Sequence, residues 1–140
     1  MKEFFDSSAL VAAMLEDEGH HEFCAQALAN TRNGYAAVHS IVETYATLTG
    51  GRLGIQLSPA EASELIHHNL SERLSFVTLT PREYLRLVKD AGPAGSRGGS
   101  IYDLLILSCA VKVGADRIYT LNQRHFKALA PKLGDRLVSI

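Results

Sequence analysis

Little in this sequence indicates a secreted or membrane protein. It has only two cysteines, Cys24 and Cys109, which are far apart and form no Cys-x-x-Cys pair, so a disulfide framework is excluded. Both lie in apolar helical patterns and are expected to be small core residues in a reducing compartment. No apolar run approaches the roughly 18 residues of a membrane span, and the N-terminus lacks the basic and apolar regions of a signal peptide. We therefore expect a cytoplasmic protein without a membrane anchor.

The sequence also lacks an excess of charge of either sign. Fourteen Lys and Arg residues face 15 Asp and Glu residues, for a net charge of −1. No broad field would hold nucleic acid or an anionic membrane, so any such contact must be a local patch. The His-Glu-x-x-His zinc pattern is absent, and Gly92–Gly99 lacks the Gly-x-x-x-x-Gly-Lys-Ser/Thr pattern of a phosphate loop. Nothing supports a Ser-His-Asp or Cys-His nucleophile.

What is present is a regular alternation of strand and helix patterns. The chain of 140 residues has 46% apolar residues, which suits one globular domain over residues 1–140. We predict strands at 2–5, 35–38, 74–79 and 117–120, a last edge strand at 137–140, and helices at 9–15, 20–29, 41–48, 58–73, 100–113 and 123–129, with another starting at 80. This order predicts a three-layer α/β/α domain with a mainly parallel central sheet.

Three helix starts carry clear capping signals. Ser58-Pro59-Ala60-Glu61 and Thr80-Pro81-Arg82-Glu83 each combine an N-cap residue, a proline at the first helical position and a capping-box glutamate. Ser100 is predicted to cap the nearly all-apolar helix that follows it. Asp103 lies in the first turn of that helix, where it either completes a capping box with Ser100 or serves as a buried ligand.

Four polar residues stand where strands end or the following helices begin. Asp6 follows the first strand, Glu43 lies in the helix after the second, Asp103 opens the helix before the fourth, and Asn122 follows the fourth. In parallel sheets these positions converge outside the carboxyl ends of the strands. Three converging carboxylates would repel and raise each other's pKa values, and Mg²⁺ or Mn²⁺ would relieve that repulsion. Separately, Asp6 could cap a helix, Glu43 could face solvent and Asn122 could be a turn residue.

The chain resembles PIN domains, and within them the VapC-type toxins of bacterial toxin–antitoxin modules. The resemblance covers essentially the whole chain and rests on four motifs in order: Phe4-Phe5-Asp6-Ser7-Ser8-Ala9-Leu10, the Glu43 helix, Ile101-Tyr102-Asp103, and Tyr119-Thr120-Leu121-Asn122-Gln123-Arg124-His125-Phe126. It implies a PIN-like fold and a metal-dependent endoribonuclease. It also implies a VapB-like antitoxin partner and a homodimer.

The resemblance further assigns roles to residues. Asp6, Glu43 and Asp103 match the acids that hold one or two Mg²⁺ or Mn²⁺ ions, and Ser7 matches a small hydroxyl residue beside the first acid. Asn122 stands where many relatives have a fourth Asp, which puts a second metal in doubt, although its amide could still orient water or phosphate. Water activated by the metal would attack the phosphodiester in line, leaving a 5′-phosphate and a 3′-hydroxyl.

Several basic residues are candidates for holding RNA phosphates. They are Arg52, Arg97, Arg124 and Lys127, and Arg97 is the most attractive because its glycine loop precedes Asp103. His39, four residues before Glu43, either lies near the site or only pairs with that acid.

Two other functions remain open. One is an aspartate-based phosphotransferase with Asp6 as nucleophile, although Ser8 stands where the haloacid-dehalogenase pattern needs a second Asp. The other is a non-catalytic PIN-like interaction module, against which the three intact acids argue.

Overall fold

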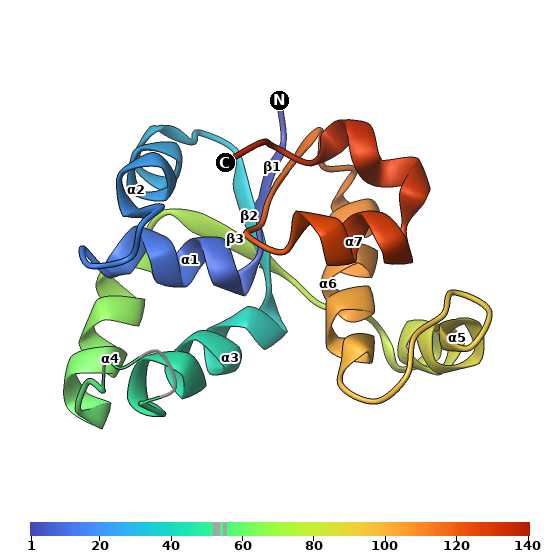
Figure 1. The fold of residues 1–140 in the computed structure, drawn as a ribbon, viewed down its shortest axis with the longest axis horizontal. Helices are drawn as coiled ribbons and strands as arrows, with labels where there is room; N and C mark the ends of the chain where they lie inside the picture. The colour runs from blue at the N-terminus through green and yellow to red at the C-terminus, as the bar shows by residue number, and fades with distance from the viewer. Residues whose placement is uncertain (52–53, 55) are drawn as a thin grey trace.

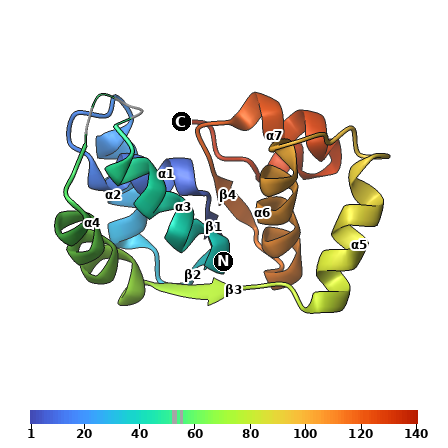
Figure 2. The same cartoon turned by 90° about the horizontal axis from the view of Figure 1, so that it is seen from below.

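A four-stranded parallel sheet forms the centre of the molecule (Figures 1 and 2). The computed structural model describes residues 1–51, 54 and 56–140, and Arg52 therefore lies outside the described residues. The strand order is β3-β2-β1-β4, with bounds β1 Glu3–Phe5, β2 Gly34–Ala37, β3 Leu74–Val77 and β4 Arg117–Tyr119. All three pairings are parallel, which confirms the predicted sheet.

Helices cover both faces of this sheet and complete the three predicted layers. One face carries α1 Ser7–Met14, α2 His21–Asn30, α3 Val38–Thr49 and α4 Pro59–Ile66, and the other carries α5 Pro81–Ala91, α6 Ser100–Val113 and α7 Gln123–Leu129. Figure 2 shows the two groups on opposite sides of the strands, with α6 between α3 and α5. No helix among the described residues has the length and apolar character needed to cross a membrane.

Alternation along the strands divides the core into two clusters. Phe5 and Tyr119 stack with their ring centroids 4.7 Å apart on the α1 side, whereas Phe4 and Ile118 belong to the cluster around α6. Strands that are buried on both faces are typical of parallel sheets between helical layers. The two cysteines are unpaired and buried, one in each cluster, as the sequence predicts.

The structure corrects three local predictions. Residues 137–140 form no strand: Leu137 makes one isolated parallel bridge to Ile118 after a 3₁₀ helix, η2 Pro131–Arg136. The helix predicted over 58–73 is α-helical only as far as Ile66, and a π-helical turn, η1 His67–Ser71, follows it. Ser100 is not an N-cap, because Gly99 holds that position and the Ser100 hydroxyl bonds to the backbone of Arg97 instead. Both proline-containing capping boxes, at Ser58 and Thr80, are present as predicted.

The sheet order places a topological switch point between β1 and β4. Strand β1 pairs with β2 on one side and with β4 on the other, and Phe5 is in register with Tyr119. The residues that follow these two strands, Asp6 and Thr120, therefore emerge next to each other at the carboxyl edge of the sheet. In open α/β sheets this is the place where ligands bind.

Candidate active site

Asp6 is the buried centre of the site. It directly follows β1, its residue surface is 2% exposed, and its backbone N–H donates to Tyr119 O at 2.9 Å. Its Oδ2 accepts hydrogen bonds from Ser8 Oγ at 2.7 Å and Thr120 Oγ1 at 2.8 Å. Asp6 occupies the N-cap position of α1, as the helix-cap alternative expects, but its side chain makes no capping hydrogen bond to that helix.

The same two hydroxyls fasten the segment that follows β4. Ser8 Oγ accepts from the backbone N–H of Leu121 at 3.0 Å, and Thr120 Oγ1 accepts from that of Asn122 at 3.0 Å. Each hydroxyl thus accepts a hydrogen bond from a backbone N–H and donates one to the carboxylate of Asp6. The sequence analysis missed both roles, although both residues stand inside the motifs that contain Asp6 and Asn122.

The charge of Glu43 acts on both of the other acids. Burial and, to a lesser extent, the charge of Glu43 raise the pKa of Asp6 to about 6 against the opposing hydrogen bonds from Ser8 and Thr120. Burial also raises the pKa of Asp103, with Glu43 adding to the increase and His125 opposing it. Burial is the main cause of both increases, and the charge of Glu43 on α3 adds to the pKa of Asp6, which follows β1, and to that of Asp103 on α6.

Two histidines flank the acids. His39 Nε2 lies 3.3 Å from Glu43 Oε2 on α3, and His125 Nε2 on α7 lies 3.5 Å from Asp103 Oδ2 on α6. Asp103 thus turns toward α7 and does not form the capping box with Ser100. The pairing of His39 with Glu43 confirms the predicted contact along one helical face.

The remaining candidate residues take different positions. Ser7 Oγ donates to Ser40 Oγ at 3.0 Å in a buried contact, so Ser8 and not Ser7 bonds Asp6. Asn122 is exposed and precedes α7 without capping it through its side chain. Arg97 is exposed in the loop before α6. No observation tests Ser7 or Arg97 against substrate, and both roles stay predictions.

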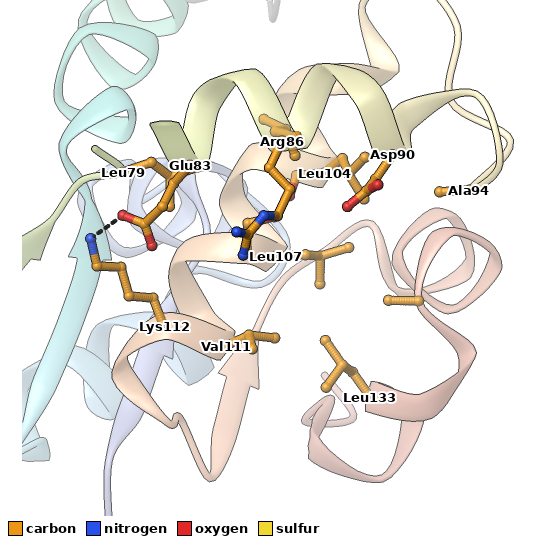
Figure 3. Close-up of a pocket in the computed structure, with 13 residues that line it drawn as sticks. Leu79, Glu83, Arg86, Asp90, Ala94, Leu104, Leu107, Val111, Lys112 and Leu133 are labelled. Atoms are coloured by element: carbon orange, nitrogen blue, oxygen red, sulfur yellow. Dashed lines mark hydrogen bonds and ion pairs between the residues drawn. The ribbon is translucent and has the colours of Figure 1, made fainter. Parts of the chain in front are cut away.

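Two cavities lie beside α6, and His125, the partner of Asp103, lines one of them. A cavity of about 600 Å³ between the loop before α6 and α7 is lined by Asn122, Arg124 and His125 among others. Another, of about 430 Å³, lies between α5 and α6 (Figure 3). In Figure 3, Lys112 pairs with Glu83 across its rim while Leu107, Val111 and Leu133 line it. None of the three acids lines either cavity, and the first is linked to the candidate site through His125.

The donor chemistry of the acids fits a hard divalent cation. Carboxylate oxygens are the ligands that Mg²⁺ and Mn²⁺ prefer, and a cation would stabilise the charged forms of Asp6 and Asp103, whose pKa values are raised by burial and, to a lesser extent, by Glu43. Both hydroxyl donors use Oδ2 of Asp6, and no side chain among the described residues donates to Oδ1. As the described side chains lie, no three His, Cys, Asp or Glu residues are grouped closely enough to coordinate one ion. Binding would therefore draw Glu43 and Asp103 inward.

Comparison with protein families decides the identity of the fold. The PIN domain family model matches residues 4–131, which is most of the chain. The chain belongs to the PIN domain family. The match includes Asp6, Glu43, Asp103 and Asn122 and reaches from β1 into η2. A search of curated proteins found no match to this PIN domain.

Solved structures with the same fold are VapC and VapBC proteins. VapC20 of Mycobacterium tuberculosis, a Sarcin-Ricin loop cleaving toxin, is 17% identical with a TM-score of 0.72, covering 91% of this chain and 95% of its own. VapBC2 of Rickettsia felis, solved with a DNA fragment from its promoter, is 18% identical with a TM-score of 0.67 and covers 99% and 98%. VapBC-1 of nontypeable Haemophilus influenzae is 21% identical with a TM-score of 0.61 and covers 94% of each chain. These likenesses extend over nearly the whole PIN fold.

Proposed function

We propose that this PIN domain is the toxin of a VapBC-type module, an endoribonuclease that hydrolyses RNA phosphodiester bonds with Mg²⁺ or Mn²⁺. Asp6, Glu43 and Asp103 hold the ion. The observation that carries the proposal is the buried carboxylate of Asp6 at the switch point of the sheet, held by Ser8 and Thr120 in a chain that belongs to the PIN domain family. Its pKa is raised mainly by burial, and such perturbed carboxylates are typical of catalytic sites.

The residues around the acids set their geometry. Ser8 and Thr120 fix the orientation of the Asp6 carboxylate through Oδ2, which directs Oδ1 toward the ion. Asn122, whose backbone is tied to Thr120, presents a neutral amide that orients water or phosphate. When bound, the ion supplies a more acidic water as nucleophile and offsets charge on the phosphate and the leaving oxygen.

Basic residues near the site hold the RNA backbone. The proposed phosphate ligands are Arg97 in the loop before α6 and Arg124 in the cavity beside His125. Ser7 supports the substrate side of the site through its buried contact with Ser40. The RNA-cleaving neighbour VapC20 supports RNA as the substrate class.

A protein partner regulates the proposed toxin. The neighbours from Rickettsia felis and Haemophilus influenzae are VapBC proteins, which supports a VapB-like antitoxin for this chain. We further propose a homodimer that acts in the cytoplasm.

The proposal is tested by incubating the purified chain with a mixed-sequence single-stranded RNA, with Mg²⁺ or with EDTA. Cleavage should require the divalent ion, leave 5′-phosphates, and fall at least 100-fold in Asp6→Asn and Asp103→Asn. Circular dichroism checks that both variants fold, and Glu61→Gln, in the capping box of α4, is the matched control that should keep activity. Metal-independent cleavage, or a phosphorylated Asp6, would reject this function.

A further inference from the structure

The candidate site is bordered by an aromatic side chain to which the proposed chemistry gives no role. Tyr102 on α6 stacks on His39 of α3, with ring centroids 5.2 Å apart and an angle of 2° between the planes. Tyr102 is nevertheless 51% exposed. Because His39 covers one face, the exposed surface of Tyr102 lies on the opposite face and along the ring edge.

This stacked pair is connected to two of the three acids. Tyr102 directly precedes Asp103 on α6, and His39 Nε2 lies 3.3 Å from Glu43 Oε2. On its other side Asp103 contacts His125, which lines the cavity that also contains Arg124. The stacked pair and the cavity are therefore both linked to Asp103, through Tyr102 and through His125.

We propose that the exposed face of Tyr102 is a stacking platform for one base of single-stranded RNA, next to the phosphate that is cleaved. This inference rests on the proposed ribonuclease function. A flat aromatic face accepts any base, and stacking on it stabilises single-stranded nucleic acid without reading sequence. His39 holds the ring in one orientation, so less side-chain freedom is lost when a base stacks.

RNA fits this face better than a protein partner does. Two polar contacts accompany the stacked pair, His39 with Glu43 and, at the residue after Tyr102, Asp103 with His125. A base brings its own polar edge and phosphate, which suits such surroundings. Because Tyr102 directly precedes Asp103 on α6, the proposal places the stacked base near the reacting phosphate.

The absence of tryptophan from the chain allows a direct test. Tyr102→Trp introduces a single indole at the proposed platform, in the Asp6→Asn background with Mg²⁺ and, separately, with native acids in EDTA. Titration with a single-stranded oligouridine RNA should quench the indole emission of this variant along the same binding curve that anisotropy of the labelled RNA reports. An abasic oligonucleotide of equal length should bind without that quenching.

Tyr84→Trp is the matched control. Tyr84 lies on α5 and is 40% exposed, but α5 is separated from α3 by α6 in both views (Figures 1 and 2). The indole emission of the Tyr84→Trp variant should stay unchanged when the same RNA binds. Equal quenching in the Tyr84→Trp and Tyr102→Trp variants would mean that the signal does not report stacking, and would overturn the proposal.

Steady-state cleavage provides the second test. Tyr102→Leu should raise KM about ten-fold, as expected for one lost base stack, with little change in kcat. Tyr102→Phe should restore the native KM, because stacking needs the ring and not the hydroxyl. An unchanged KM in Tyr102→Leu would overturn the platform.

The outcomes separate this inference from the function on which it rests. If RNA is bound and cleaved but the emission of the Tyr102→Trp variant does not change, the ribonuclease stands and the platform is rejected, the exposed face of Tyr102 belonging to a protein contact instead. If the native chain neither binds nor cleaves RNA with Mg²⁺, the proposed function itself fails. If RNA is bound and quenching occurs only in the Tyr102→Trp variant, the platform is established.

Discussion

Thr120 Oγ1 donates a 2.8 Å hydrogen bond to Oδ2 of Asp6, although the two residues are 114 positions apart in the chain. The bond joins the ends of β1 and β4, whose register brings Phe5 beside Tyr119. It therefore fixes the most buried acid of the site to the strand on the other side of the switch point. Both residues are almost completely buried, so the bond is protected from competition by water.

The first prediction concerns this bond. Thr120→Val keeps the shape of the side chain but leaves the Asp6 carboxylate with one donor fewer. A hydrogen bond to a charged group contributes about 2 kcal/mol, so the free energy of unfolding at pH 7.5 should fall by about that amount. Cleavage should fall about ten-fold or more, because the orientation of the metal ligand is relaxed. Urea denaturation and the RNA assay measure the two effects.

Thr44 provides the control for that substitution. It is fully buried on α3, and its hydroxyl has no hydrogen-bond partner among the described residues. Thr44→Val should therefore leave stability unchanged or increase it. Equal losses for the Thr44 and Thr120 variants would show that the bond to Asp6 has no special role.

The second prediction concerns the pH dependence of stability. Burial raises the pKa of Asp6 from 3.8 to about 6, so between these values the folded chain binds a proton that the unfolded chain does not. The contribution of Asp6 to the free energy of unfolding is then fully present at low pH and is lost as pH rises through about 6. The shift corresponds to about 3 kcal/mol above pH 7.

Asp6→Asn removes that penalty and provides the measurement. In EDTA at pH 7.5 the variant should be more stable than the native chain by up to about 3 kcal/mol, and the difference should vanish near pH 4. Comparing the two proteins at each pH cancels the contributions of the acids that do not interact with Asp6. A variant that is less stable than the native chain at pH 7.5 would contradict the assigned origin of the shift.

The third prediction concerns the two histidines. The charge of His125 lowers the pKa of Asp103, so His125→Ala should raise that pKa and move the acidic limb of the pH–rate profile to higher pH. His39→Ala is the matched variant, because His39 contacts Glu43 instead. NMR titration of the Asp103 carboxyl carbon should show the shift in the first variant only. The same shift in both would mean that His125 has no specific effect on Asp103.

The fourth prediction concerns the basic residues. Each arginine that contacts an RNA phosphate contributes about 0.7 to the slope of log affinity against log salt for a single strand. Arg124→Gln and Arg97→Gln should each reduce the slope by about that amount, as measured by anisotropy in the Asp6→Asn background. Arg82→Gln, an exposed position at the start of α5, should leave it unchanged. If the salt slopes of Arg97→Gln and Arg124→Gln equalled that of Arg82→Gln, Arg97 and Arg124 would be excluded as phosphate contacts.

Much of the fold could be predicted because its signals are local. The capping boxes at Ser58 and Thr80 mark two helix starts, and buried strands such as β1 read as short apolar runs ended by a polar residue. The error at residues 137–140 has a physical cause. An apolar, β-branched run favours a strand, but Leu137 finds only one partner position beside Ile118 after η2.

The acids of the site could be found from the sequence, but their surroundings could not. Asp6, Glu43 and Asp103 stand out because each is embedded in apolar sequence. Ser8 and Thr120 meet at Asp6 only because β1 and β4 are adjacent in the sheet, and strand order is not a local property. The contact of Asp103 with His125 likewise depends on how α7 packs against α6.

The most direct test of the central claim is calorimetric titration of the chain with Mn²⁺ in the absence of RNA. The account predicts binding at one or two sites in the native chain, at least ten-fold weaker binding in each of Asp6→Asn, Glu43→Gln and Asp103→Asn, and unchanged binding in Glu61→Gln. Equal Mn²⁺ affinity in the native chain and in the three site variants would contradict it.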